Sequence, residues 1–324
     1  MSLIRSRIFW LTIASYLLAS FVFVSLRGGV VPSGVSGTTL VAQLSGFYGI
    51  LFWQLLLIAI IFYLTRGRNE TQQILPQADP RVLKKEIFEL IAYGASVLAG
   101  GQLLGHILGM GGIGLHLPGT LYLTHSIPSV FQTFVWMIYN LVFFALIPYF
   151  WFRNKGYSKS DVLLRSRNFK NDLVVIFVIL ALESMAQFFA LSNLQGLSGA
   201  QLFWGAIISF LVYLFGTGLP ILIFVQALLV PRYFRVSNSF ATAVVLGGVS
   251  YAALHMFEYW TLYDSWQHIL VSLIVVGLQF IGPGMVKSTL TLRTGNAWTH
   301  LWAYHAIAPH VVVDLANIVR IFNL

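Results

Sequence analysis

The feature that most constrains this chain is a series of long apolar stretches. Each is long enough, or nearly so, to cross the roughly 30 Å hydrocarbon core of a bilayer as a helix. Charged residues make up only 9% of the 324 residues, against about 25% in a soluble domain, so a soluble fold could not cover its surface with polar groups. The nine stretches are 8–26, 40–65, 86–110, 128–152, 171–193, 199–231, 239–257, 267–287 and 297–321.

These stretches predict an all-α fold, a polytopic membrane helix bundle of about nine transmembrane helices. A transmembrane barrel is excluded because its strands are short and alternate in polarity. The stretch 199–231 is too long for one straight span, and Gly216, Gly218 and Pro220 predict a break in its middle. The first stretch is interpreted as a signal anchor, since its apolar run is too long for a cleaved signal peptide and no small-x-small site follows it.

The positions of Lys and Arg predict the orientation of the bundle. If the N-terminus is cytoplasmic and all nine stretches cross, all but two of the 19 basic residues fall inside, as the positive-inside rule requires. The exceptions are Arg27 and Arg320. Topology thus explains the net charge of +9, and we expect no nucleic-acid partner. At the inner face, Asp79 before Pro80 predicts an N-cap that starts the third span.

Ionisable side chains at membrane depth are costly and are usually functional or paired. Glu183 and Asp314 are the two carboxylates predicted deep inside the spans. His310 and Asp314 are four residues apart and share a helix face, which suits either a carboxylate orienting an imidazole or two ligands of one metal. His305 lies about 140° from His310 on a straight helix, so only a kink at Pro309 would bring both to one cavity.

A second pair occurs in the stretch 239–257, where His255 and Glu258 are three residues apart. Metal-ligand candidates are His255, Glu258, His310 and Asp314, and a divalent metal is the one cofactor that these residue types suggest. The chain has no cysteine, which excludes a thiolate site and a cysteine nucleophile. Purely structural interpretations stay open: an interfacial His–Glu pair, buried histidines bonded to backbone carbonyls, and a Glu183 hydrogen-bonded between helices.

Several motifs in the C-terminal part resemble those of the intramembrane CAAX-protease and bacteriocin-processing (CPBP) family. Tyr251 to His255 resembles the family's FxxxH motif, and Leu292 to Trp298 resembles its Arg-Thr-Gly-x-x-Trp stretch. Leu229 to Tyr233 is similar to the end of the first motif helix, and the histidines after Trp298 resemble the closing HxxxN/D motif. The likeness covers residues 199–316, and it implies a CPBP-like transmembrane core at 171–324 behind N-terminal helices and basic loops at 1–170.

The resemblance implies a plasma-membrane peptidase with a polar cavity inside the bilayer. By this likeness His255 is the first catalytic histidine, and the second is His310, completed by Asp314, or else His305. The chain departs from the family at its first motif, EExxxR, because the glutamates fall on Ile221 and Leu222 and the arginine falls on Gln226. Another acid would then have to serve as the base, and Glu183 is the deepest candidate, while Glu258 is the closest in sequence to His255.

Three functional hypotheses follow. The first is a divergent CPBP-type intramembrane peptidase that acts on a membrane peptide. The second is a catalytically degraded relative that binds a membrane protein or peptide, as immunity, assembly or maturation factors do. The third is a membrane protein that holds a metal or haem through its histidines. In each case the lipid bilayer surrounds the chain.

Overall fold

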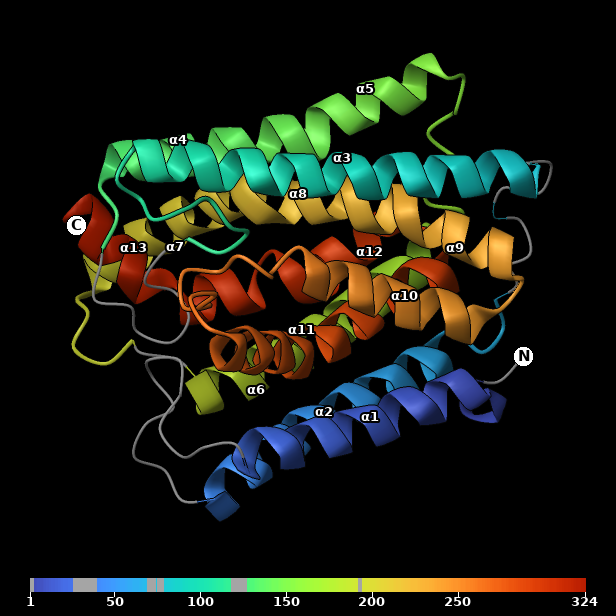
Figure 1. Ribbon diagram of the computed structural model, residues 1–324, viewed down its shortest axis with the longest axis horizontal. Helices are drawn as coiled ribbons and strands as arrows, with labels where there is room; N and C mark the ends of the chain where they lie inside the picture. The colour runs from blue at the N-terminus through green and yellow to red at the C-terminus, as the bar shows by residue number, and fades with distance from the viewer. Residues whose placement is uncertain (1–2, 26–39, 69–73, 75–78, 118–126, 192–193) are drawn as a thin grey trace.

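The computed structural model describes residues 3–25, 40–68, 74, 79–117, 127–191 and 194–324. Every regular element within these ranges is helical, so the all-α prediction is confirmed. The helices lie side by side along the long dimension of the molecule (Figure 1). They are α1 (Arg7–Ser25), α2 (Leu40–Leu64), α3 (Pro80–Ile107), α4 (Val130–Asn140), α5 (Ile147–Asn154), α6 (Phe169–Leu191), α7 (Gly199–Tyr213), α8 (Leu219–Ile221), α9 (Val230–Ser237), α10 (Phe240–Ala253), α11 (Trp266–Thr294), α12 (Ala297–His300) and α13 (Leu315–Phe322).

The helices support a multi-pass membrane protein, although the count of nine spans is not confirmed. Seven helices in the described ranges are long and apolar enough to cross a bilayer. An eighth is reached if Ala297–Val313 and Leu315–Phe322, which meet at an angle of 56°, form one bent span. The stretch 239–257 differs most from the expectation, because its helix α10 has only 14 residues and falls short of the roughly 20 that a straight span needs.

The predicted break near Gly216 is wrong. A single helix runs from Gly199 to Ser237, and the chain between α7 and α9 becomes π-helical at Leu214–Gly218 and Leu222–Leu229. These wider turns keep the segment helical around Pro220. Gly216 serves close packing instead, because a Cβ at this position would lie 2.0 Å from the Trp136 ring.

The C-terminal half forms the buried centre of the bundle. In the most apolar window of each span, 61% of the residues are buried for Gly199–Ser237 and 50% for α11, against 22 to 28% for α1 to α6. In Figure 1, α1 and α2 lie along one edge, and α3 with α4 and α5 along the opposite edge, with α10, α11 and α12 between them. The buried ionisable residues therefore lie where the surrounding helices exclude lipid.

Polar groups fix the helix ends on the side of the molecule where α3 begins. The predicted N-cap is confirmed, since the Asp79 carboxylate accepts a hydrogen bond from the Arg81 N–H at 2.8 Å. Asp172 on α6 is buried and accepts from Arg68 at 2.5 Å and from Asn296 at 2.8 Å. These contacts tie together α6, the end of α2 and the turn between α11 and α12.

Candidate functional site

The segment after α11 carries most of the predicted site residues. The Arg-Thr-Gly-x-x-Trp stretch that opens it forms a turn: Gly295 takes the left-handed conformation (φ 60°) that ends α11, and Asn296 caps α12 by accepting from the Trp298 N–H. This local role accounts for the glycine and the asparagine of the motif. The helix that follows is π-helical at Leu301–His305 and Ala308–Val313, with an irregular junction between these two parts.

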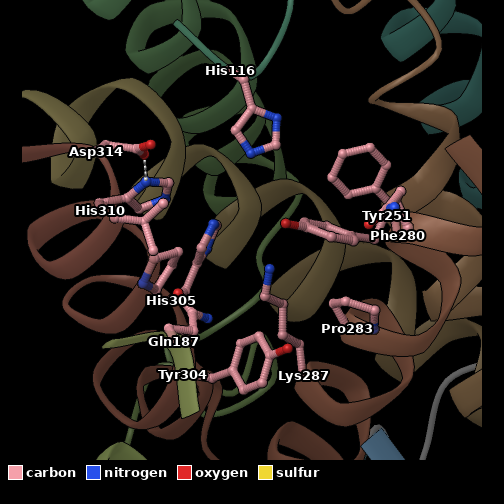
Figure 2. A pocket seen from close by; sticks show the side chains of 13 residues that line it. His116, Gln187, Tyr251, Phe280, Pro283, Lys287, Tyr304, His305, His310 and Asp314 are labelled. Carbon is pink, nitrogen blue, oxygen red and sulfur yellow. Dashed lines mark hydrogen bonds and ion pairs between the residues drawn. The ribbon is translucent and has the colours of Figure 1, made fainter. Parts of the chain in front are cut away.

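That irregular helix brings His305 and His310 to one cavity. Their ring centroids are 5.2 Å apart, and both residues line a cavity of about 140 Å³. The two side chains meet because the irregular junction precedes Pro309, where the sequence predicted a kink. His310 Nδ1 lies 2.9 Å from the Asp314 carboxylate, and Figure 2 shows this pair on one wall of the cavity. The i, i+4 spacing thus brings His310 and Asp314 into direct contact.

His255 occupies the turn that follows α10, and its ring is completely buried. Its Nδ1 is 2.6 Å from the carbonyl oxygen of Tyr251, one helical turn earlier. The ring stacks on Phe280 at 3.9 Å between centroids. Phe280 lines the cavity whereas His255 does not, so His255 lies behind the cavity wall. In the described part of the chain, no hydrogen-bond partner reaches His255 Nε2.

His116, which the sequence analysis passed over, connects His255 to His310. Its ring centroid is 4.8 Å from that of His255 and 6.4 Å from that of His310. The ring extends into the cavity from one end (Figure 2). The Glu258 carboxylate holds the other side of His116, with Oε1 3.1 Å from Nδ1 and 3.2 Å from the backbone nitrogen. Glu258 therefore pairs with His116 across 142 positions of sequence rather than with His255.

Glycines allow the loop after α3 to pack closely against the rest of the protein, with His116 inside the bundle. Gly109, Gly111 and Gly112 have positive φ angles, and a Cβ on Gly114 would lie 2.8 Å from the carbonyl oxygen of Phe257. The carbonyl of Gly114 accepts hydrogen bonds from two buried side chains of α4, Trp136 at 2.9 Å and Asn140 at 3.0 Å. Such a glycine run in an uncharged loop is the signal that the loop packs inside the protein rather than on its surface.

Lys287 on α11 faces the same cavity from the end opposite His116 (Figure 2). It is 1% exposed, and its ammonium lies over the rings of Tyr251 and Tyr304, at 3.6 and 5.4 Å from their centroids. Within the described ranges no acidic group forms an ion pair with it. An ionisable side chain buried at membrane depth is costly and is usually functional, so Lys287 marks the cavity as a polar place inside the bundle.

Glu183 lies outside the wall of the cavity. It is buried on α6, and its oxygens accept hydrogen bonds from Trp53 of α2 at 2.7 Å and from Gln187 at 2.6 Å. Gln187 does line the cavity, whereas Glu183 does not. The hydrogen bond from Trp53 joins α2 to α6, so Glu183 has the contacts of a structural carboxylate that is hydrogen-bonded between helices.

The positions that align with the family's EExxxR motif also lie away from the cavity. Ile221 and Leu222 are fully buried in the apolar core and do not line the cavity. Gln226 accepts a hydrogen bond from Thr291 of α11 at 3.0 Å, one of the contacts between the π-helical segment and α11. Apolar packing and the hydrogen bond of the Gln226 side-chain amide therefore hold this part of the helix against its neighbours.

A second cavity of about 330 Å³ also has His116 in its wall, together with residues that do not line the first cavity. It is lined by the glycine loop, by Glu258 and by Tyr263, and His116 is common to both cavities. Tyr263 lies between α10 and α11, where burial raises the pKa of its phenol. The phenol therefore stays protonated and donates to the Met256 carbonyl. His116 thus separates the inner cavity from the outer one.

Comparison of the chain with protein-family models, with curated proteins and with solved structures found no match.

Proposed function

We propose that this protein is an intramembrane peptidase, a divergent relative of the CPBP type, that hydrolyses a peptide bond of a membrane-embedded or membrane-proximal substrate. The observation that carries the proposal is the His310–Asp314 pair at 2.9 Å on the wall of a cavity inside the helix bundle. A histidine oriented by a buried carboxylate is a common general base in hydrolysis.

The proposed chemistry depends on which nitrogen of the His310 ring has no hydrogen-bond partner. Asp314 accepts from His310 Nδ1, which leaves Nε2 as the basic nitrogen, and no partner in the described residues occupies that nitrogen. His310 would take a proton from a water molecule as the water attacks the peptide carbonyl. Lys287, which faces the same cavity, would stabilise the negative charge that develops on the carbonyl oxygen. The proton on His310 would then pass to the leaving amine.

This assignment replaces the glutamate base that the resemblance implies. Ile221 and Leu222 have no group that can take a proton, and both oxygens of Glu183 are already hydrogen-bonded outside the cavity wall. His255 is placed behind Phe280 and would support His116 rather than touch the substrate. We therefore assign proton transfer to His310, oriented by Asp314, with His305 as a neighbour that shapes the cavity.

The experiment uses the purified protein in lipid nanodiscs and a panel of transmembrane peptides, with the products identified by mass spectrometry. We expect the wild type to cleave at least one peptide and His310→Ala and Asp314→Asn to lower kcat/KM by about 100-fold or more. His106→Ala is the matched control, because His106 is an exposed histidine of α3. Wild-type rates in His310→Ala would refute the assignment, and an inactive wild type would refute the peptidase.

Glu183→Gln decides between the two candidate bases. Because Glu183 lies outside the cavity wall, we expect this variant to cleave at a rate close to that of the wild type. Abolished cleavage in a folded Glu183→Gln protein would transfer the role of base from His310 to Glu183.

The second candidate function is peptide binding without catalysis, and the apolar side chains of Ile221 and Leu222 at the positions of the family's glutamates favour it. Under this alternative a membrane protein or peptide co-purifies with the chain, and changing Tyr304 or Lys287 in the cavity releases it. Detection of such a partner together with an inactive wild type would favour binding over hydrolysis.

For the location, we propose a plasma-membrane protein with its N-terminus in the cytoplasm. The support is the distribution of basic residues. The helices α2, α5 and α9 all end on the side of the bundle where α1 begins (Figure 1). Arg66 follows α2, and Arg153 and Arg235 lie in the last turns of α5 and α9. Arg27, one of the two exceptions, lies outside the described residues.

A further inference from the structure

We propose that His116, His255 and Glu258 hold one divalent transition-metal ion, of the zinc type, at the junction of the two cavities. Each residue offers one ligand atom, and these atoms lie within 4.8 Å of one another. The inference deepens the proposed peptidase by naming a metal for its site, but the binding experiment below does not depend on peptide cleavage.

The separations of the ligand atoms are close to those of a metal centre. Two ligands of a tetrahedral zinc ion, each about 2.0–2.1 Å from the metal, lie about 3.3 Å apart. His116 Nδ1 and Glu258 Oε1 are already 3.1 Å apart. The longest separation, at most 4.8 Å, needs to shrink by about 1.5 Å, and His116 and Glu258 both lie in loops that join helices.

The second nitrogen of His255 is arranged as in a metal-bound imidazole. The Tyr251 carbonyl 2.6 Å from Nδ1 fixes the tautomer with the proton on Nδ1, so that Nε2 presents a lone pair. That Nε2 is buried and has no hydrogen-bond partner in the described ranges. An imidazole nitrogen without a partner in a buried site costs stability, and a metal ion is a partner that would remove this cost.

The ligand set indicates the class of metal. Two imidazoles and one carboxylate form the protein ligands of several catalytic zinc sites, and they leave a coordination position open for water. Without cysteine the site is unsuited to the soft metals that prefer thiolates. His116 borders the outer cavity of about 330 Å³, which provides an entry path for the ion. A bound divalent metal lowers the pKa of a water molecule, the nucleophile that peptide hydrolysis needs.

His310 and Asp314 are not ligands in this assignment. The His310 ring is 6.4 Å from that of His116 between centroids, and its Nδ1 is bonded to Asp314. The two sets of residues therefore separate two roles: His116, His255 and Glu258 bind the metal, while His310 moves the proton. This separation makes the two proposals independently testable.

The test measures metal binding by the purified, chelator-treated full-length protein. It is titrated with Zn²⁺, its metal content is measured by mass spectrometry, and Co²⁺ is added to a second sample to record visible d–d bands. We expect one ion per chain and a Co²⁺ spectrum of low coordination number. His255→Ala and Glu258→Gln should each lower the Zn²⁺ affinity by about 100-fold or more, beyond what the loss of an outer-shell partner causes.

Controls separate metal binding from folding and from hydrolysis. His106→Ala and His310→Ala should both keep wild-type Zn²⁺ affinity, and circular dichroism should show the same helix content in all variants. If the wild type binds no more Zn²⁺ than a protein with His116, His255 and Glu258 all changed, the site is refuted. Wild-type affinity in His255→Ala refutes it as well. A protein that binds Zn²⁺ but cleaves no peptide would refute the peptidase proposal and leave the metal site standing. Peptide cleavage that continues after complete metal removal would refute a role of the metal in catalysis.

Discussion

At the scale of single residues, the cavity and the wall behind Phe280 contain buried nitrogen atoms that have no partner among the described residues. His255 Nε2, His305 Nδ1 and His310 Nε2 are all buried and, in the described part of the chain, make no hydrogen bond. Buried polar atoms are nearly always satisfied in folded proteins. Three such nitrogens close together indicate a place for a ligand, because an abandoned site would gain stability by replacing them with apolar groups.

Lys287 provides a prediction in which stability and activity change in opposite directions. Its buried amine forms no ion pair among the described residues, and taking an unpaired ionisable group out of water costs stability. We expect Lys287→Met to raise the thermal unfolding temperature in detergent micelles and to lower kcat by about 100-fold with little change in KM, because the lost group acts on the developing oxyanion.

Lys287→Arg is the matched control, since it keeps the positive charge while changing its shape. It should retain more activity than Lys287→Met and gain no stability. A lower unfolding temperature for Lys287→Met would show that the ammonium stabilises the fold, and it would contradict the role we assign to it.

At the scale of helices, π-helical turns and short connections decide where the polar side chains lie. The segment from Ala297 to Phe322 is α-helical at its ends and π-helical in two parts between them. This irregularity places His305 and His310 on one cavity, although a regular helix would separate them. On the other side of the bundle, the turn at Gly295 and Asn296 is held by Asp172 of α6, so helix packing fixes the start of this segment.

Asp172 therefore provides an element-scale prediction. It is buried and accepts from Arg68 at 2.5 Å, from Ser166 at 2.6 Å and from Asn296 at 2.8 Å. Asp172→Ala would remove the carboxylate that pairs with the buried Arg68 guanidinium, and we expect a loss of about 3–5 kcal/mol in the free energy of unfolding. Chemical unfolding followed by circular dichroism in micelles measures this loss.

The control for this prediction is Asp264→Asn, which changes an exposed carboxylate whose side chain contacts His268. It should leave the unfolding free energy close to that of the wild type. A loss for Asp172→Ala no larger than that of the control would mean that the network does not hold α6 to the turn after α11.

At the scale of the whole molecule, the N-terminal helices surround a buried C-terminal centre, and both cavities depend on contacts between the two. His116 comes from the loop after α3, whereas His255, Lys287 and His310 come from the C-terminal half. The candidate site is thus assembled across the predicted boundary between residues 170 and 171. A C-terminal fragment without α3 would lack His116.

The topology prediction belongs to this scale. Under the positive-inside arrangement, a reporter enzyme fused after residue 160 should be cytoplasmic, and one fused after residue 120, which lies outside the described residues, should be external. Activity of paired reporters that function on only one side of the membrane measures this directly. The same side for both fusions would contradict the arrangement of spans from which the orientation is inferred.

The sequence alone determined the properties that follow from local periodicity. Long apolar runs specify membrane helices because each residue's burial depends on the bilayer rather than on a distant partner. Asp79 as a cap and His310 beside Asp314 were predictable for the same reason, since both contacts join residues within one helical turn. Only the tertiary structure decided that Glu258 pairs with His116, that Lys287 faces the cavity and that Ile221 and Leu222 do not. These facts depend on how a glycine-rich loop and π-helical turns pack against helices far away in sequence, and no periodic pattern encodes such contacts.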